Sequence, residues 1–359
     1  MSENKRAIVI DTGSGYCKSG FASDDSPRSV FRTKVGDSIN GKEPLVGDEA
    51  VNETNILSPK EPITKLGIPN NFSDLETLWS AVFNYELRVN SREHDILLCE
   101  SLATDNSIRE RCAEIFFETF EIQNYFSTTQ SVLGLYSAGK TTGLVLDSGY
   151  NITSSVYVNE GYALPKSISK VEIGGLDINK RLVELLNKNG YNFRGSDGFD
   201  LIEKFKKGGH NKTYKLPDGK TLNLQNYLPK CVDYLFTKLF NLMSRDCDND
   251  ELSFIDCDSG VEMWRPKDVV VIGGNTKLPC FVNKLEDNIT DMYQYRNGDI
   301  GVIAASNRQY SAWIGGSVLA SLSTYQPQWV SKQEYDECGA TQCSKIDKNH
   351  KVGLHQLFI

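Results

Sequence analysis

The hydrophobic pattern of this 359-residue chain alternates short apolar runs with longer stretches of helical spacing. Apolar runs over residues 7–10, 95–99 and 268–272 predict buried β-strands, and residues 17–21 predict the partner of the first run. Apolar side chains that recur every three or four residues predict helices over 73–89, 107–120, 130–138, 176–189 and 310–321. Because strands and helices interleave, the chain is predicted to have an α/β fold.

Turn and capping residues mark the ends of several predicted elements. Ser73 with Glu76 has the form of a capping box at the start of a helix. Gly139 and Gly190 follow two predicted helices, in the position where glycine commonly ends a helix. A Pro-Asp-Gly turn divides a predicted strand–turn–strand unit over residues 214–224.

Two segments of the chain have similar sequences, IVIDTGSGYCKSG at residues 8–20 and LVLDSGYNITSSV at residues 144–156. They are called the two copies of the repeated phrase. Each copy predicts a strand, a glycine turn and a second strand, with an aspartate near the end of the first strand. Consecutive N–H groups in such a turn form a concave site for anions. A single copy would most simply be an ordinary hairpin turn. Two copies with the aspartate at the same offset favour phosphate binding.

The side chains of the repeated phrase add to this prediction. Ser14 supplies a hydroxyl donor, and Lys18 can place a positive charge on a phosphate. Asp11 and Asp147, at the strand ends, can orient waters bound to Mg²⁺, which keeps several waters beside its carboxylate and phosphate contacts. A third unit, VVVIGGNTKLP from Val269, has a strand followed by a glycine pair suited to packing against a nucleoside.

Composition limits the classes of partner. The net charge of −8 and the pI of about 5.2 exclude a global basic field, so direct nucleic-acid binding is not expected. Nine scattered cysteines without a C-x-x-C pair argue against a disulfide framework and a structural zinc site. The polar start is too poor in apolar residues for a signal peptide, and no apolar run is long enough to span a bilayer. A reduced, cytoplasmic setting is expected.

Two further patterns are interpreted as structural. Residues 134–141 fit the P-loop pattern, but a helix precedes them and a strand follows, which reverses the order that a P-loop needs. We interpret this segment as the end of a helix. The acidic run RDCDNDELSFIDCD has the spacing of the first calcium ligands of an EF-hand, but Glu251 and Cys257 stand where that loop needs glycine and glutamate.

Several segments match one family, in order and across nearly the whole chain. They are DTGSGYCKSGFASDDSPRSVF, LVGDEA, FNYELRV, FFETF, SVLGLYSAGKTTGLVLDSG, EGYALP, LPDG, YSAWIGGSVLASLST and SKQEYDE. In these segments the chain resembles actin, and it is identified as a divergent member of the actin family. The resemblance implies two duplicated lobes of the ribonuclease-H type with a nucleotide cleft between them. The lobes would be residues 1–137 with 310–359 and residues 138–309, with smaller subdomains at about 33–60 and 174–243.

The resemblance also implies a site for ATP or ADP with Mg²⁺ or Ca²⁺. Gln130 matches the glutamine that positions the attacking water, and Asp11 and Asp147 match the aspartates that contact the metal through water. The implied nucleotide-binding residues are Gly13, Ser14, Gly15, Tyr16, Lys18, Asp147, Ser148, Gly149, Tyr150, Gly175, Lys206, Gly274, Asn275 and Lys277. An active protein would be a slow ATP phosphohydrolase of the actin type.

The chain departs from actin within this implied site. Tyr150 and Asn151 replace an aspartate and a glycine of the second loop, and Ser154 replaces a histidine near the path of the water. Lys207 and Gln309 replace a glutamate and a lysine near the base. Because phosphoryl transfer depends on positioning and charge, these changes predict hydrolysis slower than that of ordinary actin, with nucleotide binding spared.

The surfaces that actin uses for assembly are changed as well. The loop that docks into the next subunit is reduced to residues 37–45, KGGHNK replaces a helix-sized segment, and the apolar loop used across the filament falls on the acidic RDCDNDEL. The C-terminal segment is longer and different. Because one damaged patch weakens every contact along an open assembly, poor homopolymerisation is expected, with capping or copolymerisation still open.

Three functions are compatible with these patterns. The first is an ATP-binding cytoskeletal protein with a role in actin filaments and cell motility, whose partners would be actin, a second copy of the chain, or actin-binding proteins. The second is a non-polymerising scaffold subunit of a larger complex, which the loop losses favour. The third is a small-molecule kinase of the same fold, for which the chain offers no obvious general base.

Overall fold

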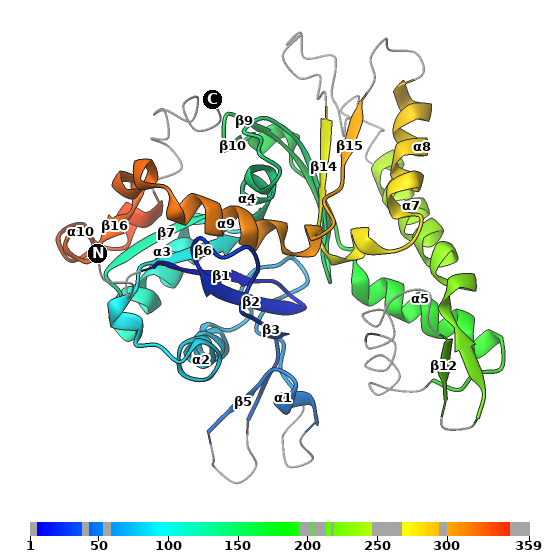
Figure 1. The fold of residues 1–359 in the computed structure, drawn as a ribbon, viewed down its shortest axis with the longest axis horizontal. Helices are drawn as coiled ribbons and strands as arrows, with labels where there is room; N and C mark the ends of the chain where they lie inside the picture. The colour runs from blue at the N-terminus through cyan, green and yellow to red at the C-terminus, as the bar shows by residue number, and fades with distance from the viewer. Residues whose placement is uncertain are drawn as a thin grey trace. The chain divides into compact units, whose positions relative to one another are not determined.

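A computed structural model describes residues 6–37, 43–52, 59–193, 203, 213–216, 219–245, 268–293 and 300–344 of the chain. The chain folds as two compact units, whose elements are labelled in Figure 1. The first unit consists of Met1–Val145, Val156–Ile168 and Tyr310–Ile359, and the second of Leu146–Ser155 and Ser169–Gln309. The lobe boundaries given above stay a prediction, whereas the α/β class is confirmed.

The first unit is built on a six-stranded mixed sheet with the order β16-β7-β6-β1-β2-β3. β1 pairs antiparallel with β2 and parallel with β6, which is in turn parallel with β7. The strands are β1 (Ile8–Thr12), β2 (Tyr16–Phe21), β3 (Ser29–Arg32), β6 (Ile96–Glu100), β7 (Asn124–Thr129) and β16 (Val330–Ser331). The strands predicted for β1, β2 and β6 are confirmed, and the sequence analysis assigned no strand to β7 or β16.

The helices of the first unit include α2 (Phe72–Ala81), α3 (Asn106–Glu114), α4 (Gln130–Ser137), α9 (Ser311–Ser321) and α10 (Lys332–Cys338). The first two continue as π-helical turns, Val82–Leu87 and Ile115–Thr119, within the helices predicted there. The capping box predicted at Ser73 is wrong. The side chain of Asn71 accepts a hydrogen bond from the Ser73 backbone N–H at 2.9 Å, so Asn71 caps a helix that begins at Phe72.

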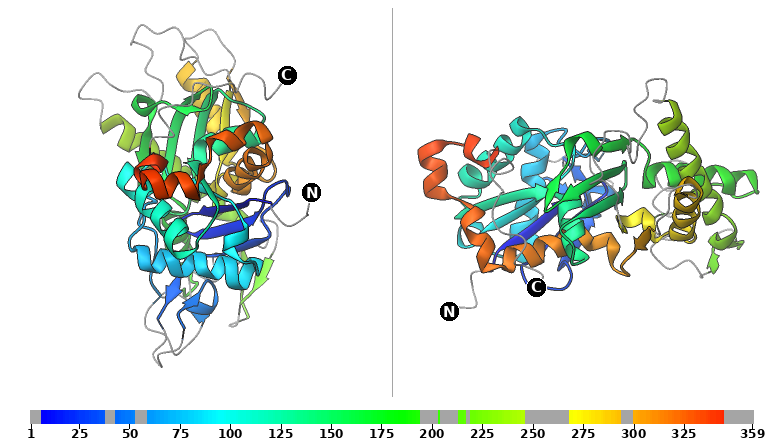
Figure 2. Two further views of the ribbon diagram at one scale, coloured as in Figure 1. Left: turned by 90° about the vertical axis from the view of Figure 1, so that its left-hand side faces the viewer. Right: turned by 90° about the horizontal axis from the view of Figure 1, so that it is seen from above.

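Both faces of the first sheet are covered, which explains why its central strands are continuously apolar. Successive side chains of a strand point to opposite faces. Ile8 and Ile10 of β1 are fully buried in a core that includes α2 and α3 residues. Val9, between them, lies against α9, where the Trp313 indole N–H donates to the Val9 carbonyl oxygen at 3.0 Å. Figures 1 and 2 show α9 running along β1 and β6.

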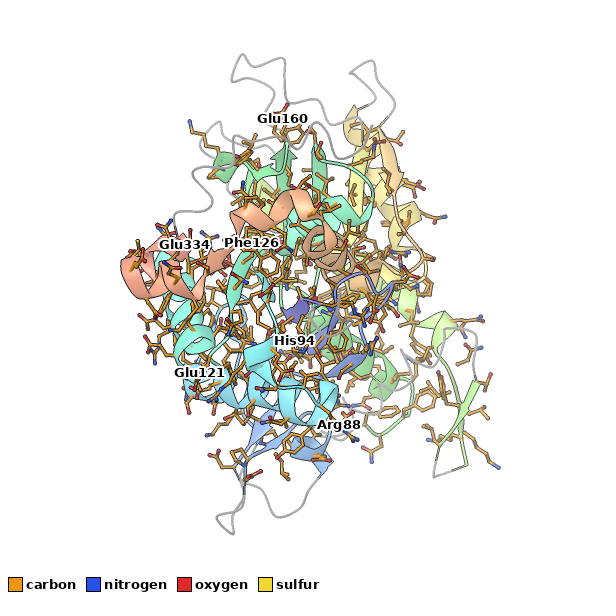
Figure 3. The ribbon with its side chains drawn as sticks, turned by 60° about the vertical axis from the view of Figure 1, so that its left-hand side comes forward. Arg88, His94, Glu121, Phe126, Glu160 and Glu334 are labelled. Atoms are coloured by element: carbon orange, nitrogen blue, oxygen red, sulfur yellow. The ribbon has the colours of Figure 1, made fainter. Side chains whose placement is uncertain are left out.

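Aromatic side chains fill the interior of the first unit behind β7. Phe126, labelled in Figure 3, packs edge to face on Tyr325 with the ring centroids 5.2 Å apart.

Glu334, also labelled there, accepts hydrogen bonds from the backbone N–H and hydroxyl of Ser331 at 2.8 Å and so completes the capping box of α10. These bonds hold the carboxylate form and lower the pKa of Glu334.

The segment with the P-loop pattern ends α4, as predicted. Gly139 follows the helix with a φ of +69°, a conformation that favours glycine. Strand β8 then begins at Gly143. A P-loop would need the strand before the turn and the helix after it, so the interpretation of this segment as a helix end is confirmed.

The second sheet has the order β10-β9-β8-β14-β15, and β11 also pairs with β9. Its strands are β8 (Gly143–Ser148), β9 (Thr153–Asn159), β10 (Tyr162–Ala163), β11 (Ser169–Val171), β14 (Asp268–Ile272) and β15 (Gly301–Ile303). The predicted hairpin over 144–158 and the predicted strand over 268–272 are confirmed.

The other elements of the second unit include three helices and a small hairpin. They are α5 (Gly175–Lys188), α7 (Leu228–Arg245), α8 (Phe281–Tyr293) and the pair β12 (Thr213–Lys215) and β13 (Thr221–Asn223). The helix predicted for α5 and the strand–turn–strand unit are confirmed, and the sequence analysis assigned no helix to α7 or α8. No helix within the described ranges is long and apolar enough to cross a bilayer.

Candidate functional site

The first copy of the repeated phrase is the hairpin of β1 and β2. Its register pairs Asp11 with Lys18 and Thr12 with Cys17. The backbone N–H of Gly13 donates to the Tyr16 carbonyl oxygen at 3.1 Å. This bond closes the hairpin and leaves Ser14 and Gly15 as its two-residue tip.

Thr33, just after β3, holds the tip of this first hairpin by its carbonyl groups. The Thr33 hydroxyl donates to the Gly13 carbonyl oxygen at 2.6 Å, and its backbone N–H donates to the Gly15 carbonyl oxygen at 3.1 Å. In the described part of the chain the backbone N–H groups of Ser14 and Gly15 have no backbone acceptor. Adjacent N–H groups in this state are suited to binding an anion such as a phosphate.

The aspartate of the first hairpin is buried and bonded through both carboxylate oxygens. Asp11 is 2% exposed. Its Oδ2 accepts from Lys18 Nζ at 2.7 Å, and its Oδ1 accepts from Gln130 Nε2 at 2.7 Å. Gln130 is the first residue of α4, which follows β7 directly. The structure therefore brings together the three side chains that the sequence analysis assigned to charge and to water positioning in this copy.

A polar pair lies beneath the tip of the first hairpin. Thr12 Oγ1 accepts from the Trp79 indole N–H at 3.0 Å and lies 3.9 Å from Cys17 Sγ. Complete burial raises the pKa of the Cys17 thiol to about 12, because the thiolate would lose its hydration, and the nearby Asp11 carboxylate acts in the same direction. Cys17 is therefore a neutral thiol at physiological pH.

The second copy is the hairpin of β8 and β9, and it repeats the backbone geometry of the first. The Gly149 backbone N–H donates to the Ile152 carbonyl oxygen at 2.9 Å, which leaves Tyr150 and Asn151 as the two-residue tip. Beneath this tip the hydroxyls of Ser148 and Thr153 are 2.9 Å apart, in the places of Thr12 and Cys17 in the first copy. The two hairpins therefore share one hydrogen-bonding scheme around their aspartates.

The start of α5 holds the carbonyl groups of the second hairpin. The Gly175 N–H donates to the Gly149 carbonyl oxygen at 3.1 Å, and the Leu176 N–H donates to the Tyr150 carbonyl oxygen at 2.8 Å. This approach requires glycine, since a Cβ at Gly174 would lie 2.5 Å from the Tyr150 carbonyl oxygen. The first N–H groups of α5 are thus engaged by the hairpin itself.

The turn after β14 packs against the other side of the second hairpin. Gly273 has a φ of +95°, and a Cβ there would lie 2.4 Å from the Ser148 carbonyl oxygen and 2.5 Å from Asp147 Oδ1. Asn275, 6% exposed, donates through Nδ2 to the Gly149 carbonyl oxygen at 2.5 Å. This part of the predicted nucleoside unit therefore contacts three consecutive residues of the hairpin.

The remaining predicted site residues are placed less closely. Gly274 is exposed, and a Cβ there would meet nothing within 4 Å. Lys277 Nζ donates to the Ser306 carbonyl oxygen at 2.5 Å. Gly175 lies beside Tyr150, whose Cδ2 would be 3.5 Å from a Cβ at Gly175. Lys206 lies outside the described residues, as do Lys207 and the acidic run with the calcium-like spacing.

Three residues that position the hairpins were missed by the sequence analysis. Gly174 had a signal, since it stands in a glycine pair just before the predicted helix, where close backbone approach is common. Thr33 and Thr153 had none, because a threonine hydroxyl can bond to water as readily as to a carbonyl group. Only the packing of β3 and of residue 173 beside the hairpins gives these hydroxyls their acceptors.

The donor set fits a nucleotide with a divalent cation. The first hairpin presents two N–H groups at its tip beside the ammonium of Lys18, which suits a polyphosphate. The described residues include no group of three or more His, Cys, Asp or Glu side chains able to hold a metal. Mg²⁺ commonly binds through one or two carboxylates, substrate phosphates and several waters, so the single aspartate of each hairpin is compatible with a cation carried by a nucleotide.

Comparisons with known proteins give one family. The family model described as Actin matches residues 2–207 and 196–348. A curated protein of Dictyostelium discoideum named "Putative actin-29" is 35% identical over 370 aligned residues, which cover 93% of this chain and 95% of the relative.

Proposed function

This chain belongs to the actin family, and we propose that it binds ATP or ADP together with Mg²⁺ or Ca²⁺. The observation that carries the proposal is the repeated hairpin. Gly13 and Gly149 make the same N–H bond to a carbonyl group three residues on, and each follows a strand whose next-to-last residue is an aspartate. Retaining one turn geometry around two aspartates is expected if both turns contact phosphates.

The residues of the two hairpins divide the binding task. We assign the N–H groups of Ser14 and Gly15, the ammonium of Lys18 and the backbone of the second tip at Gly149 and Tyr150 to phosphate oxygens. Asp11 and Asp147 would hold waters of the cation, which neutralises phosphate charge when it is bound. Gln130, whose amide lies 2.7 Å from Asp11, would orient the attacking water. The nucleoside would contact Gly175, Gly274, Asn275, Lys277 and Lys206.

Nucleotide binding is tested with the purified full chain. We expect about one adenine nucleotide per chain to copurify, and added Mg-ATP to raise the melting temperature. The rise follows because a ligand that binds only the folded state stabilises it by mass action. A preparation that holds no nucleotide, and whose melting temperature no purine nucleotide changes, would contradict the proposal. The variant Lys34→Ser, at a partly exposed ion pair with Glu61, serves as a control that leaves the response intact.

We further propose that hydrolysis is slower than in ordinary actin. Tyr150 stands at the tip of the second hairpin and cannot supply a carboxylate. The hydroxyl of Ser154 cannot act as a general base toward the attacking water. The double variant Tyr150→Asp with Ser154→His is expected to raise the rate of phosphate release on the order of tenfold or more, since a positioned base contributes at least that much. Wild-type turnover as fast as that of ordinary actin would overturn this proposal.

The cellular role we propose is a cytoplasmic protein of the actin cytoskeleton that assembles poorly alone. The shortened docking loop and the acidic RDCDNDEL segment support weak self-assembly. Actin filaments and actin-binding proteins are the expected partners, with a function in cell motility. Co-sedimentation with ordinary actin, together with no pelleting of the purified chain alone, is the expected result. Failure to co-sediment would favour the scaffold function, and robust self-pelleting would overturn weak assembly.

A further inference from the structure

A chain of hydrogen bonds runs through the second hairpin and starts at Asn275. The two N–H groups of its amide go to the Gly149 carbonyl oxygen at 2.5 Å and to Ser148 Oγ at 3.3 Å. Ser148 Oγ and Thr153 Oγ1 are 2.9 Å apart, and Thr153 Oγ1 donates to the Ile173 carbonyl oxygen at 2.8 Å. The hydrogen bonds therefore link the turn after β14 to both strands of the hairpin.

The direction of each bond is fixed by the last one. A hydroxyl has a single proton. Because the Thr153 hydroxyl donates its proton to the Ile173 carbonyl oxygen, it can only accept from Ser148, and Ser148 must be the donor. Ser148 then has only acceptor positions left, and Asn275 is the donor that fills one of them. An amide NH₂ is the one end of an asparagine that satisfies this arrangement, so the donors of Asn275 are specified and not merely its shape.

The site around Asn275 leaves little room for an alternative side chain. Asn275 is 6% exposed, and a Cβ at Gly175 would lie 2.8 Å from its Oδ1. The same Gly149 carbonyl oxygen that accepts from Asn275 also accepts from the Gly175 N–H. The amide thus sits where the hairpin, the start of α5 and the turn after β14 meet, and it joins all three.

We propose that Asn275 is a positioning residue that holds the tip of the second hairpin in the conformation that binds nucleotide phosphates. This inference rests on the proposed nucleotide binding. It differs from the assignment of Asn275 to the nucleoside, because here the side chain acts through Gly149 and Ser148. Both N–H groups of its amide donate to protein atoms.

The test compares two substitutions at Asn275 with a matched control. Asn275→Asp keeps the shape and removes both donors, and Asn275→Ala removes them without adding a charge. The control is Asn187→Asp on α5, because Asn187 also bonds a loop through its amide, with Nδ2 and Oδ1 each 2.9 Å from the backbone of Phe193. The probe is etheno-ATP with Mg²⁺, and the dissociation constant is measured by fluorescence on the full chain.

We expect the Asn275 variants to bind etheno-ATP at least about tenfold more weakly than the wild type, because the Gly149 carbonyl oxygen loses one of its two donors and Ser148 Oγ loses the donor from Asn275. Asn187→Asp should change the affinity less than about twofold. Affinity of both Asn275 variants equal to the wild type overturns the inference. A wild type that binds no nucleotide instead overturns the proposed function, so the two failures are distinguishable.

A pH profile separates loss of donors from loss of packing. A protonated carboxyl group at position 275 can donate one bond to the Gly149 carbonyl oxygen, so the affinity of Asn275→Asp should recover as the pH is lowered. The affinity is expressed relative to the wild type, because Asp147 packs on the same turn and Arg308 bonds Thr276 there in both proteins. Asn275→Ala should show no recovery. An Asn275→Asp variant that binds weakly and does not recover affinity at low pH would overturn the donor role. If Asn275→Asp does not fold, the affinity of Asn275→Ala decides whether Asn275 positions the hairpin.

Discussion

The two hairpins have one backbone scheme but are held by different neighbours. In the first, Thr33 bonds the carbonyl oxygens of Gly13 and Gly15, through its hydroxyl and its N–H. In the second, the start of α5 bonds the carbonyl oxygens of Gly149 and Tyr150, and Asn275 also bonds that of Gly149. A duplicated turn can thus be supported by unrelated contacts, provided that the carbonyl groups are satisfied and the tip keeps its shape.

The hairpins differ more in charge than in shape. Lys18 lies across from Asp11 in the first copy, and the register of the second copy, set by Gly149 with Ile152, puts Ser154 in the corresponding position. The first copy therefore holds a buried ion pair where the second has a neutral hydroxyl. If the protein binds nucleotide as proposed, the lysine charge for a phosphate would come from the first copy, while the second would contribute backbone geometry.

The substitution Lys18→Ser makes the first hairpin resemble the second and is expected to have the largest effect. Lys18 and Asp11 are 16% and 3% exposed at their side chains, so removing one partner leaves a buried charge. We expect the free energy of unfolding to fall by about 3–5 kcal/mol. Urea denaturation measures it. Lys34→Ser should cost less than about 1 kcal/mol, because its partner Glu61 is 46% exposed at the side chain and stays hydrated. Equal losses for both would refute the distinction.

The adjacent glycines 273 and 274 test the support of the second hairpin. Gly273→Ala places a Cβ 2.4 Å from the Ser148 carbonyl oxygen in a backbone with φ of +95°. We expect it to lower the free energy of unfolding by about 3 kcal/mol through overpacking and strain. Gly274→Ala has open space and should change stability by less than about 0.5 kcal/mol. Similar unfolding curves for the two variants would show that the turn does not press on the hairpin.

Cys17→Thr gives the first hairpin the hydroxyl pair of the second and should alter its response to alkali. The pKa of Cys17 is raised from 9.0 to about 12, so the unfolded thiol ionises before the folded one. The wild-type free energy of unfolding therefore falls as pH rises from about 9 towards 12. Threonine has no thiol to ionise, so the variant lacks this part of the fall. We expect an advantage for the variant on the order of 1–2 kcal/mol near pH 10.5 relative to pH 8. A difference between the proteins that does not change with pH would contradict this.

Thr33→Val removes the hydroxyl that holds the first tip and should have the smallest effect. The Gly13 carbonyl oxygen loses the bond of 2.6 Å, at an expected cost of about 1 kcal/mol in the free energy of unfolding. The control is Thr237→Val, whose hydroxyl bonds an exposed helix carbonyl group and should cost less. Hydrogen exchange at the hairpin is the second readout. Unchanged exchange at residues 13–16 would show that Thr33 does not hold the tip.

Much of the fold follows from local pattern. The apolar runs at β1, β6 and β14 predict strands because a strand buried on both faces is apolar over most of its length. The glycines after α4 and α5 end those helices with positive φ. The start of α2 was misplaced because Asn71 and Ser73 are both good caps, and only the observed bond selects Asn71. The strand β7 was missed because only Tyr125 and Phe126 of its six residues are apolar, so no apolar run marks it.

What the sequence by itself determined is the repeated Asp–Gly turn, the family and the residues that line each tip. The tertiary structure decided which partner each of those residues takes. Gln130 bonds Asp11, and Asn275 bonds Gly149, across 119 and 126 residues of chain. A hydrogen bond depends on atoms meeting within about 3 Å. Residue type specifies which donors and acceptors are available, and only the packing of distant segments brings a given pair within reach.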